Sequence, residues 1–160
     1  TSREIPDARE IIARLVDELS PEMVARAFNN RANCYTDLGD QLRSLMNYEL
    51  AKRLDPTYDF PWYNSSGCYI NMGNFERSLQ EINQAIKINS MYPDAYARRA
   101  DIYLVLGNTK DAIDDCTRAI ALEPKHAWAF RTRARAFEII GNMYQAMLDH
   151  TSVEKLEKGS

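Results

Sequence analysis

The chain has 160 residues with a formal net charge of −3, and 45% of its residues are hydrophobic. This length is typical of a single domain, and the small charge argues against a general nucleic-acid or membrane binder. The sequence holds no run of about 18 apolar residues that could span a membrane, and no signal peptide is visible. We therefore expect neither nucleic acid nor membrane among the partners.

The N-terminal part of the chain is predicted to form one amphipathic helix, which ends before a second helix begins. Residues 7–19 carry five apolar residues at helical spacing: Ile11, Ile12, Leu15, Val16 and Leu19. Ser20, Pro21 and Glu22 then supply an N-cap, a proline in the first turn and an acidic residue, which is typical of a new helix start. We expect residues 1–24 to be a capping helix and a link. The alternative is the second half of a degenerate upstream repeat.

Four glycines stand 34 residues apart in the rest of the chain: Gly39, Gly73, Gly107 and Gly141. Each follows an apolar residue and precedes an Asp or Asn. A glycine suits the left-handed position that ends a helix, and an Asp or Asn suits the N-cap of the next one. The spacing therefore predicts four units, each a helix, a tight turn and a second helix, over 25–58, 59–92, 93–126 and 127–160.

Within each unit, counted from position 1 at residues 25, 59, 93 and 127, large aromatic residues recur at positions 4 and 11 and small ones at position 8. Position 4 holds Phe28, Trp62, Tyr96 and Phe130, and position 8 holds Ala32, Ser66, Ala100 and Ala134. This pattern resembles the tetratricopeptide repeat family. The resemblance implies an all-α, right-handed solenoid of antiparallel helix pairs over residues 25–160, nine helices with the cap included. It further implies a protein-interaction module.

Two departures from the family pattern are visible. Position 7, usually leucine in the family, holds Arg31, Ser65, Arg99 and Arg133. The last unit lacks the proline at position 32 and has His150 at position 24 and Glu154 at position 28. A charge where a following repeat would pack predicts that the array ends or diverges there.

The three cysteines are expected to be free. Cys34 and Cys68 both occupy position 10, in adjacent units. Equivalent helices lie roughly 8–10 Å apart, whereas the Cα atoms of a disulfide lie within about 7 Å. We expect these two and Cys116 to be small core thiols, which favours a reducing, cytoplasmic location.

The sequence offers no recognisable catalytic or metal-binding motif. Its only histidines, His126 and His150, are expected to be structural or solvated. We expect a solvent-exposed helix face at Asp111, Asp114 and Asp115. We therefore predict that the chain is not an enzyme and needs no cofactor or metal.

The candidate site is the first-helix face opposite the aromatic core, which in the family lines a concave peptide-binding groove. The expected peptide-binding residues are Asn29, Asn33, Tyr63, Asn64, Arg98, Trp128, Arg131 and Arg135. Asparagine can pair with a peptide backbone, exposed aromatics can anchor an apolar side chain, and arginines can hold a carboxylate. The alternative is an ordinary solvated surface, with Asp94, Asp101 and Glu138 neutralising the arginines.

One subfamily binds the acidic tails of heat-shock chaperones through a two-carboxylate clamp. Asn33, Asn64 and Arg98 match that clamp, but Asn29 and Asp94 replace its two lysines. Because Asp94 would repel a carboxylate, the substitutions argue against a chaperone tail as the partner.

We expect a monomer or weak oligomer that binds a partner peptide or segment, acidic or carboxylate-bearing, in its groove. Two alternatives stay open: a self-assembly scaffold, and a targeting domain cut from a larger protein or enzyme. Single-stranded RNA binding through aromatics and arginines is disfavoured, since the chain is acidic and lacks a continuous basic stripe.

Overall fold

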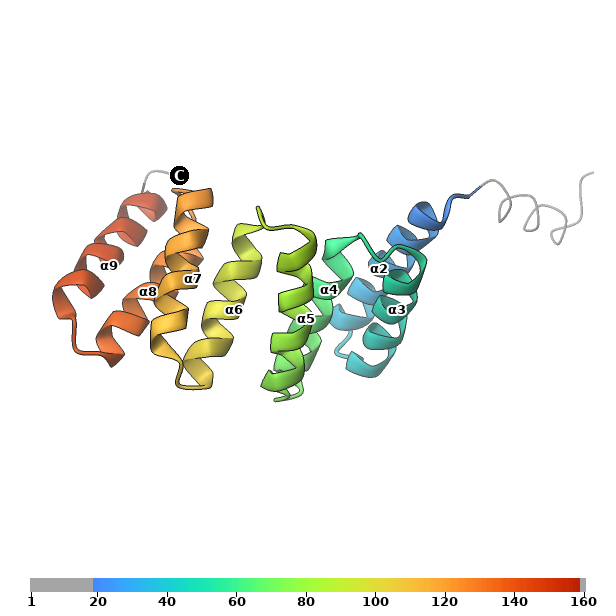
Figure 1. Cartoon of the computed structure of the whole chain (residues 1–160), viewed down its shortest axis with the longest axis horizontal. Coiled ribbons are helices and arrows are strands. Elements are labelled where there is room, and N and C mark those ends of the chain that lie inside the picture. The colour runs from blue at the N-terminus through green and yellow to red at the C-terminus, as the bar shows by residue number, and fades with distance from the viewer. Residues whose placement is uncertain (1–18, 159–160) are drawn as a thin grey trace, which may run out of the picture.

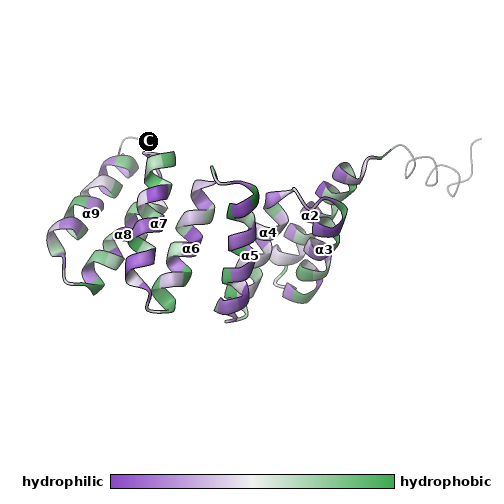
Figure 2. Ribbon diagram, in the orientation of Figure 1, coloured by the Kyte–Doolittle hydropathy of each residue, from purple (hydrophilic) through white to green (hydrophobic). Residues whose placement is uncertain are grey.

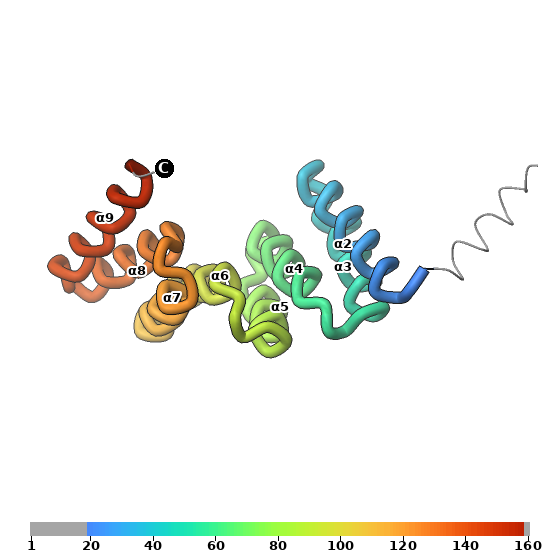
Figure 3. The backbone as a smooth tube through the Cα atoms, turned by 90° about the horizontal axis from the view of Figure 1, so that it is seen from above, coloured from blue at the N-terminus to red at the C-terminus, as the bar shows by residue number. Residues whose placement is uncertain are grey.

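The computed structural model describes residues 19–158, which form eight helices in a single curved row (Figure 1; Figure 3). The helices are α2 (Pro21–Asp37), α3 (Gln41–Leu54), α4 (Asp59–Asn71), α5 (Phe75–Ile88), α6 (Pro93–Val105), α7 (Thr109–Leu122), α8 (Ala127–Ile139) and α9 (Met143–Lys158). No strand occurs between residues 19 and 158. The capping helix expected over residues 7–19, and with it the ninth helix, lies outside the described part except for its last residue.

The four predicted glycine turns are confirmed. All four glycines have positive φ, between 73° and 80°. The side chains of Asp40 and Asn74 then accept hydrogen bonds from the backbone N–H groups of Arg43 and Arg77, each at 3.0 Å. Asn108 caps α7 without such a bond. Asn142 accepts from the Gln145 N–H at 3.3 Å, so three of the four turns have the side-chain cap, whereas all four have the positive φ that glycine permits.

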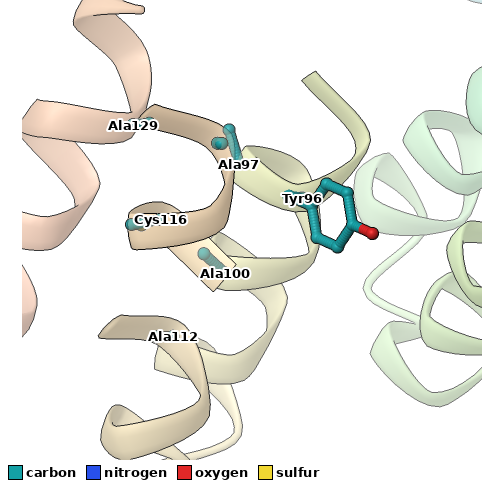
Figure 4. Packing of buried hydrophobic residues seen from close by; sticks show 7 residues of the cluster. Tyr96, Ala97, Ala100, Ala112, Cys116 and Ala129 are labelled. Atoms are coloured by element: carbon teal, nitrogen blue, oxygen red, sulfur yellow. The ribbon is translucent and has the colours of Figure 1, made fainter. Parts of the chain in front are cut away.

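Each unit is an antiparallel pair, with helix A (α2, α4, α6, α8) packed on helix B (α3, α5, α7, α9). Helix B also packs on helix A of the following unit. Small buried residues let the backbones approach. Figure 4 shows this for one cluster, to which α6 contributes Ala97 and Ala100 and α7 contributes Ala112 and Cys116. Figure 2 shows that every helix carries both hydrophilic and hydrophobic residues, and every helix has buried and exposed residues.

Of the three free cysteines, Cys68 and Cys116 are buried as expected, but Cys34 is exposed. The expectation of a core thiol was wrong for Cys34. Cys68 packs against Ala32 and Tyr48 of the preceding unit. Cys34 is on α2, the first described helix, where the described residues supply no preceding unit to cover it.

The position-7 arginines of units three and four pair with a buried carboxylate of their own unit and also contact the preceding unit. Arg99 binds both oxygens of Asp115 at 2.7 Å and donates to Asn83 of the preceding unit, also at 2.7 Å. Asp115 is buried, so the expected solvated face is wrong for this residue, while Asp111 and Asp114 are exposed.

Arg133 repeats this arrangement one unit later. It binds Asp149 at 2.8 Å and Thr117 of the preceding unit at 3.1 Å. In units three and four, the leucine usual at position 7 is thus replaced by an arginine that pairs with helix B of its own unit and also contacts the unit before it.

The junction between the first two units uses a different pair. Ser65 takes position 7 there, and its hydroxyl donates to Glu81 at 2.9 Å. The cation comes from the preceding unit, because Lys52 of α3 donates to the same carboxylate oxygen. Lys52, Ser65 and Glu81 are all buried. A buried charge is tolerated only when it is paired, so this junction depends on both units.

Candidate functional site

A pocket of about 720 Å³ opens on the face formed by the A helices. All four A helices contribute to it, and α3 adds one residue. The lining residues are Asn33, Thr36, Asp37, Tyr48, Asn64, Gly67, Ile70, Asn71, Arg98, Asp101 and Trp128. Because these helices follow one another along the row, the pocket runs across units and suits an extended ligand better than a compact one.

Arg98 supplies the positive charge of the pocket. Its Nη1 donates to the carbonyl oxygen of Tyr63 at 2.7 Å, and its guanidinium lies 3.6 Å from the centre of the Tyr63 ring. The space beside it exists because residue 67 is glycine: a Cβ there would lie 3.2 Å from Nη1. Among the described residues, no carboxylate lies within ion-pair distance of Arg98. Arg98 is therefore held in place without an ion pair of its own, although Asp37 and Asp101 also line the pocket.

A network of amides and hydroxyls lines the pocket at the first two units. Asn64 Nδ2 donates to the side-chain oxygens of Asn29 and Asn33, each at 3.2 Å. The Tyr48 hydroxyl donates to the same Asn33 oxygen at 2.6 Å. Burial raises the pKa of Tyr48 to about 12, so this hydroxyl stays neutral near pH 7. The Asn33 oxygen is thus occupied, and its amide N–H groups have no partner among the described residues.

Asp101 and Trp128 form the pocket wall at the last two units. Trp128 Nε1 donates to Asp101 at 2.8 Å, and Thr132 donates to the other carboxylate oxygen at 3.0 Å. The indole also stacks on His126, with 6.2 Å between ring centres. Trp128 is therefore fixed in orientation and presents a rigid apolar surface.

The pocket brings together four of the eight expected site residues: Asn33, Asn64, Arg98 and Trp128. Two others stand behind them. Asn29 is buried and accepts from Asn64, and Tyr63 lies under Arg98. All eight remain predictions as peptide-binding residues.

The other two expected residues lie outside the lining. Arg131 and Arg135 are exposed and pair with Glu157 at 2.6 Å and with Asp101 at 3.4 Å. The pairing with Asp101 matches the alternative in which carboxylates neutralise these arginines. Asp94 instead pairs with His126 at 2.8 Å.

Seven lining residues are not among the eight expected ones: Thr36, Asp37, Tyr48, Gly67, Ile70, Asn71 and Asp101. Thr36 and Ile70 are both at position 12 of helix A. Tyr48 belongs to a B helix. Its signal was the hydroxyl at position 24, where the next two units have Ile82 and Cys116.

No group of three His, Cys, Asp or Glu side chains in residues 19–158 is arranged to hold a metal ion. Within the same range, no helix has the length and apolar character needed to cross a membrane.

A solenoid of antiparallel helix pairs with a polar pocket across its A helices defines a helical-repeat interaction scaffold. The family models for the tetratricopeptide repeat match residues 25–58, 61–90 and 93–126, more than half of the chain. The chain belongs to the tetratricopeptide repeat family. That family consists of interaction scaffolds rather than catalysts. A comparison with curated protein sequences found no match to the chain.

Solved structures with the same fold include MamA, with a TM-score of 0.78 and 18% identity over 99% of this chain and 98% of that one. The first tetratricopeptide domain of Spaghetti (RPAP3), bound to the HSP90 peptide SRMEEVD, has a TM-score of 0.72 and 22% identity over 75% of this chain and 95% of that one. The tetratricopeptide domain of Arabidopsis OM64 has a TM-score of 0.71 and 19% identity over 74% and 98%. At these identities the likeness concerns the fold.

Proposed function

We propose that this chain is a non-enzymatic module that binds an extended peptide segment of a partner protein in the pocket of the A helices. The observation that carries the proposal is Arg98, a guanidinium held in the pocket without a carboxylate of its own. A partner carboxylate would complete it with charge-assisted hydrogen bonds. Asn33 would donate to the peptide backbone, and Trp128 would pack an apolar side chain.

A chaperone tail is not the partner we favour. The acidic peptide SRMEEVD is bound by the Spaghetti domain, and this chain has the pocket arginine and asparagines that suit an acidic segment. However, Asn29 and Asp94 stand in place of the two clamp lysines. We therefore expect one carboxylate to be recognised strongly rather than two.

The test is a fluorescence-polarisation panel of labelled heptapeptides. Each would carry one Leu or Trp and zero, one or two glutamates at varied spacing on a Gly/Ser background, with SRMEEVD as reference. We expect one glutamate at a fixed distance from the apolar residue to give the main gain in affinity. A second glutamate should add little.

Arg98→Ala is the deciding variant, and Arg118→Ala is the matched control, because Arg118 is exposed on α7, which contributes no residue to the pocket. A hydrogen bond to a charged group contributes roughly 1.5–3 kcal/mol, so Arg98→Ala should weaken the best peptide at least about tenfold. Arg118→Ala should change it by less than about twofold. Equal losses in both variants, or a panel in which no peptide binds, would contradict the proposal.

A further inference from the structure

The two ends of the row expose surfaces that are buried between units in its interior. On α2, Ala27 and Cys34 at positions 3 and 10 are exposed. Their counterparts in the other three units are buried: Pro61, Ala95 and Ala129 at position 3, and Cys68, Ile102 and Ala136 at position 10. In those units the preceding helix B covers them. This exposed face of α2 therefore corresponds to the surface on which a helix B packs in the other units.

At the other end of the row, the last helix B, α9, exposes apolar residues at positions that pack on a following unit elsewhere in the row. Met143 and Met147 of α9 are 63% and 58% exposed. They occupy positions 17 and 21, held in unit two by Phe75 and Leu79. Those two residues pack with Ala95, Ile102 and Leu106 of the next unit.

The apolar groups at the two ends thus correspond position by position. Opposite Met143 and Met147, the first unit would present Ala27, Cys34 and Leu38, at positions 3, 10 and 14. Leu38 is 79% exposed. Between units two and three, the residues at these same positions belong to one hydrophobic cluster.

Charge at the two ends is also complementary. Positions 28 and 7 of successive units lie side by side, since Lys52 and Ser65 both donate to one oxygen of Glu81. At the free ends, position 28 is Glu154 and position 7 is Arg31. Among the described residues, Arg31 has no carboxylate partner and donates only to Tyr35. Glu154 makes only an exposed contact with Lys158.

We propose that the chain associates head to tail with a second copy of itself, with α9 of one molecule taking the place of a helix B against α2 of the next. Glu154 of one copy would pair with Arg31 of the other, and the exposed methionines would pack on Ala27 and Leu38. Such a contact uses two different surfaces, so it leaves a free end after each addition. It is independent of the peptide pocket.

The first experiment measures molar mass against concentration by sedimentation equilibrium on the full chain. We expect the mass to rise with concentration. Arg31→Glu should shift the rise to about tenfold higher concentration, and Arg31→Glu with Glu154→Arg should restore it. Arg118→Glu makes the same charge change at an exposed residue of α7 and should have no effect.

The second experiment locates the contact. Positions 10 and 24 of successive units pack together, as Cys68 and Tyr48 do. His150→Cys should therefore lie near Cys34 of the next copy, and a short bismaleimide should link molecules into a ladder. Adding Cys34→Ser should abolish the ladder. Because the two thiols lie at opposite ends of one chain, a link within a molecule is not possible.

Three results would overturn the proposal. A constant monomer mass with Cys34 slow to react would mean that residues 7–19 of the same chain cover the face. A constant monomer mass with Cys34 reacting fast would leave the face open and unused. A rising mass that the charge exchange does not affect would place the contact elsewhere.

Discussion

The thiols at position 10 of the first and second units have the same place in the repeat and different surroundings. The Cys68 sulfur lies 3.6 Å from the Thr36 hydroxyl oxygen and is buried against the first unit. Burial raises the pKa of Cys68 and also that of Cys116. Since the thiolate is the reactive form, the environment rather than the sequence position decides reactivity.

We expect a disulfide reagent to label one thiol quickly in dilute native protein and two slowly. The fast thiol should be Cys34, because it is exposed, and Cys34→Ser should remove the fast phase alone. In denaturant without reductant the count should be three. A slow reaction of all three thiols in dilute solution would mean that Cys34 is covered.

A substitution at Gly67 should change the stability of α4 and the affinity of the pocket in opposite directions. Alanine in a helix interior is more stable than glycine by roughly 0.5–1 kcal/mol, but its Cβ would lie 3.2 Å from Arg98 Nη1. Gly67→Ala should therefore raise the midpoint of urea unfolding while it displaces Arg98 and lowers affinity in the peptide panel. Unchanged affinity would show that the position of Arg98 does not matter for binding.

At the scale of the helices, the 34-residue period predicted every described turn. It could do so because a positive φ at a helix end strongly selects glycine, and Gly39, Gly73, Gly107 and Gly141 all meet that need. The pocket was less accessible to the same reasoning. Asn33, Asn64, Arg98 and Trp128 follow from the face of helix A. The part played by Tyr48 depends on how α3 packs between α2 and α4, which a single-helix wheel does not contain.

The buried charges were missed for a related reason. Asp115 looks like one of three acidic residues on a surface helix, and only its pairing with Arg99, sixteen residues away, makes its burial possible. The unusual arginines at position 7 were the available signal. Position 23 is acidic in units two to four, as Glu81, Asp115 and Asp149, and the last two pair with the arginines, so the signal is a correlation between two positions rather than a feature of either.

Gly107→Val tests the turn directly. No atom lies within 4 Å of where its Cβ would be, so the cost is backbone strain alone. A left-handed conformation costs an L-residue roughly 1–2 kcal/mol, more when it is β-branched. We expect a loss of about 2 kcal/mol in the free energy of unfolding, and a smaller loss for Gly107→Asn. Equal losses in the two variants would argue that φ is not the cause.

At the scale of the whole molecule, buried ion pairs add to the apolar packing: Lys52–Glu81 joins units one and two, and Arg99–Asp115 joins the two helices of unit three. Removing one partner of such a pair costs roughly 3–5 kcal/mol, whereas an apolar pair of similar volume is often tolerated. Arg99→Met should therefore destabilise the chain by about 3 kcal/mol at pH 7.5. Arg99→Met with Asp115→Leu should recover most of that loss in urea unfolding.

The pH dependence of Arg99→Met follows from Asp115. Burial already raises the pKa of this carboxyl, while Arg99 opposes the rise. Without Arg99 the folded-state pKa lies further above the unfolded one. The stabilising contribution is then complete below the unfolded pKa of about 3.9 and is lost as pH rises through the folded value. The variant should therefore approach the parent protein in stability at pH 4.5. A gap that does not narrow would mean that Asp115 stays charged without Arg99.

The junction of Lys52, Ser65 and Glu81 bears on how such an array can lengthen by internal duplication. Unit three holds both Arg99 and Asp115, so a tandem second copy of it would arrive with its charges already matched. A tandem copy of unit two would set its Glu81 against Ile86, the position-28 residue of the unit before it, in place of Lys52. That carboxylate would keep the Ser65 hydroxyl, but its only remaining cation would be the half-exposed Arg77, 3.4 Å away. Internal duplication therefore keeps the buried charges paired at unit three and leaves them poorly paired at unit two, although the two units have the same backbone fold.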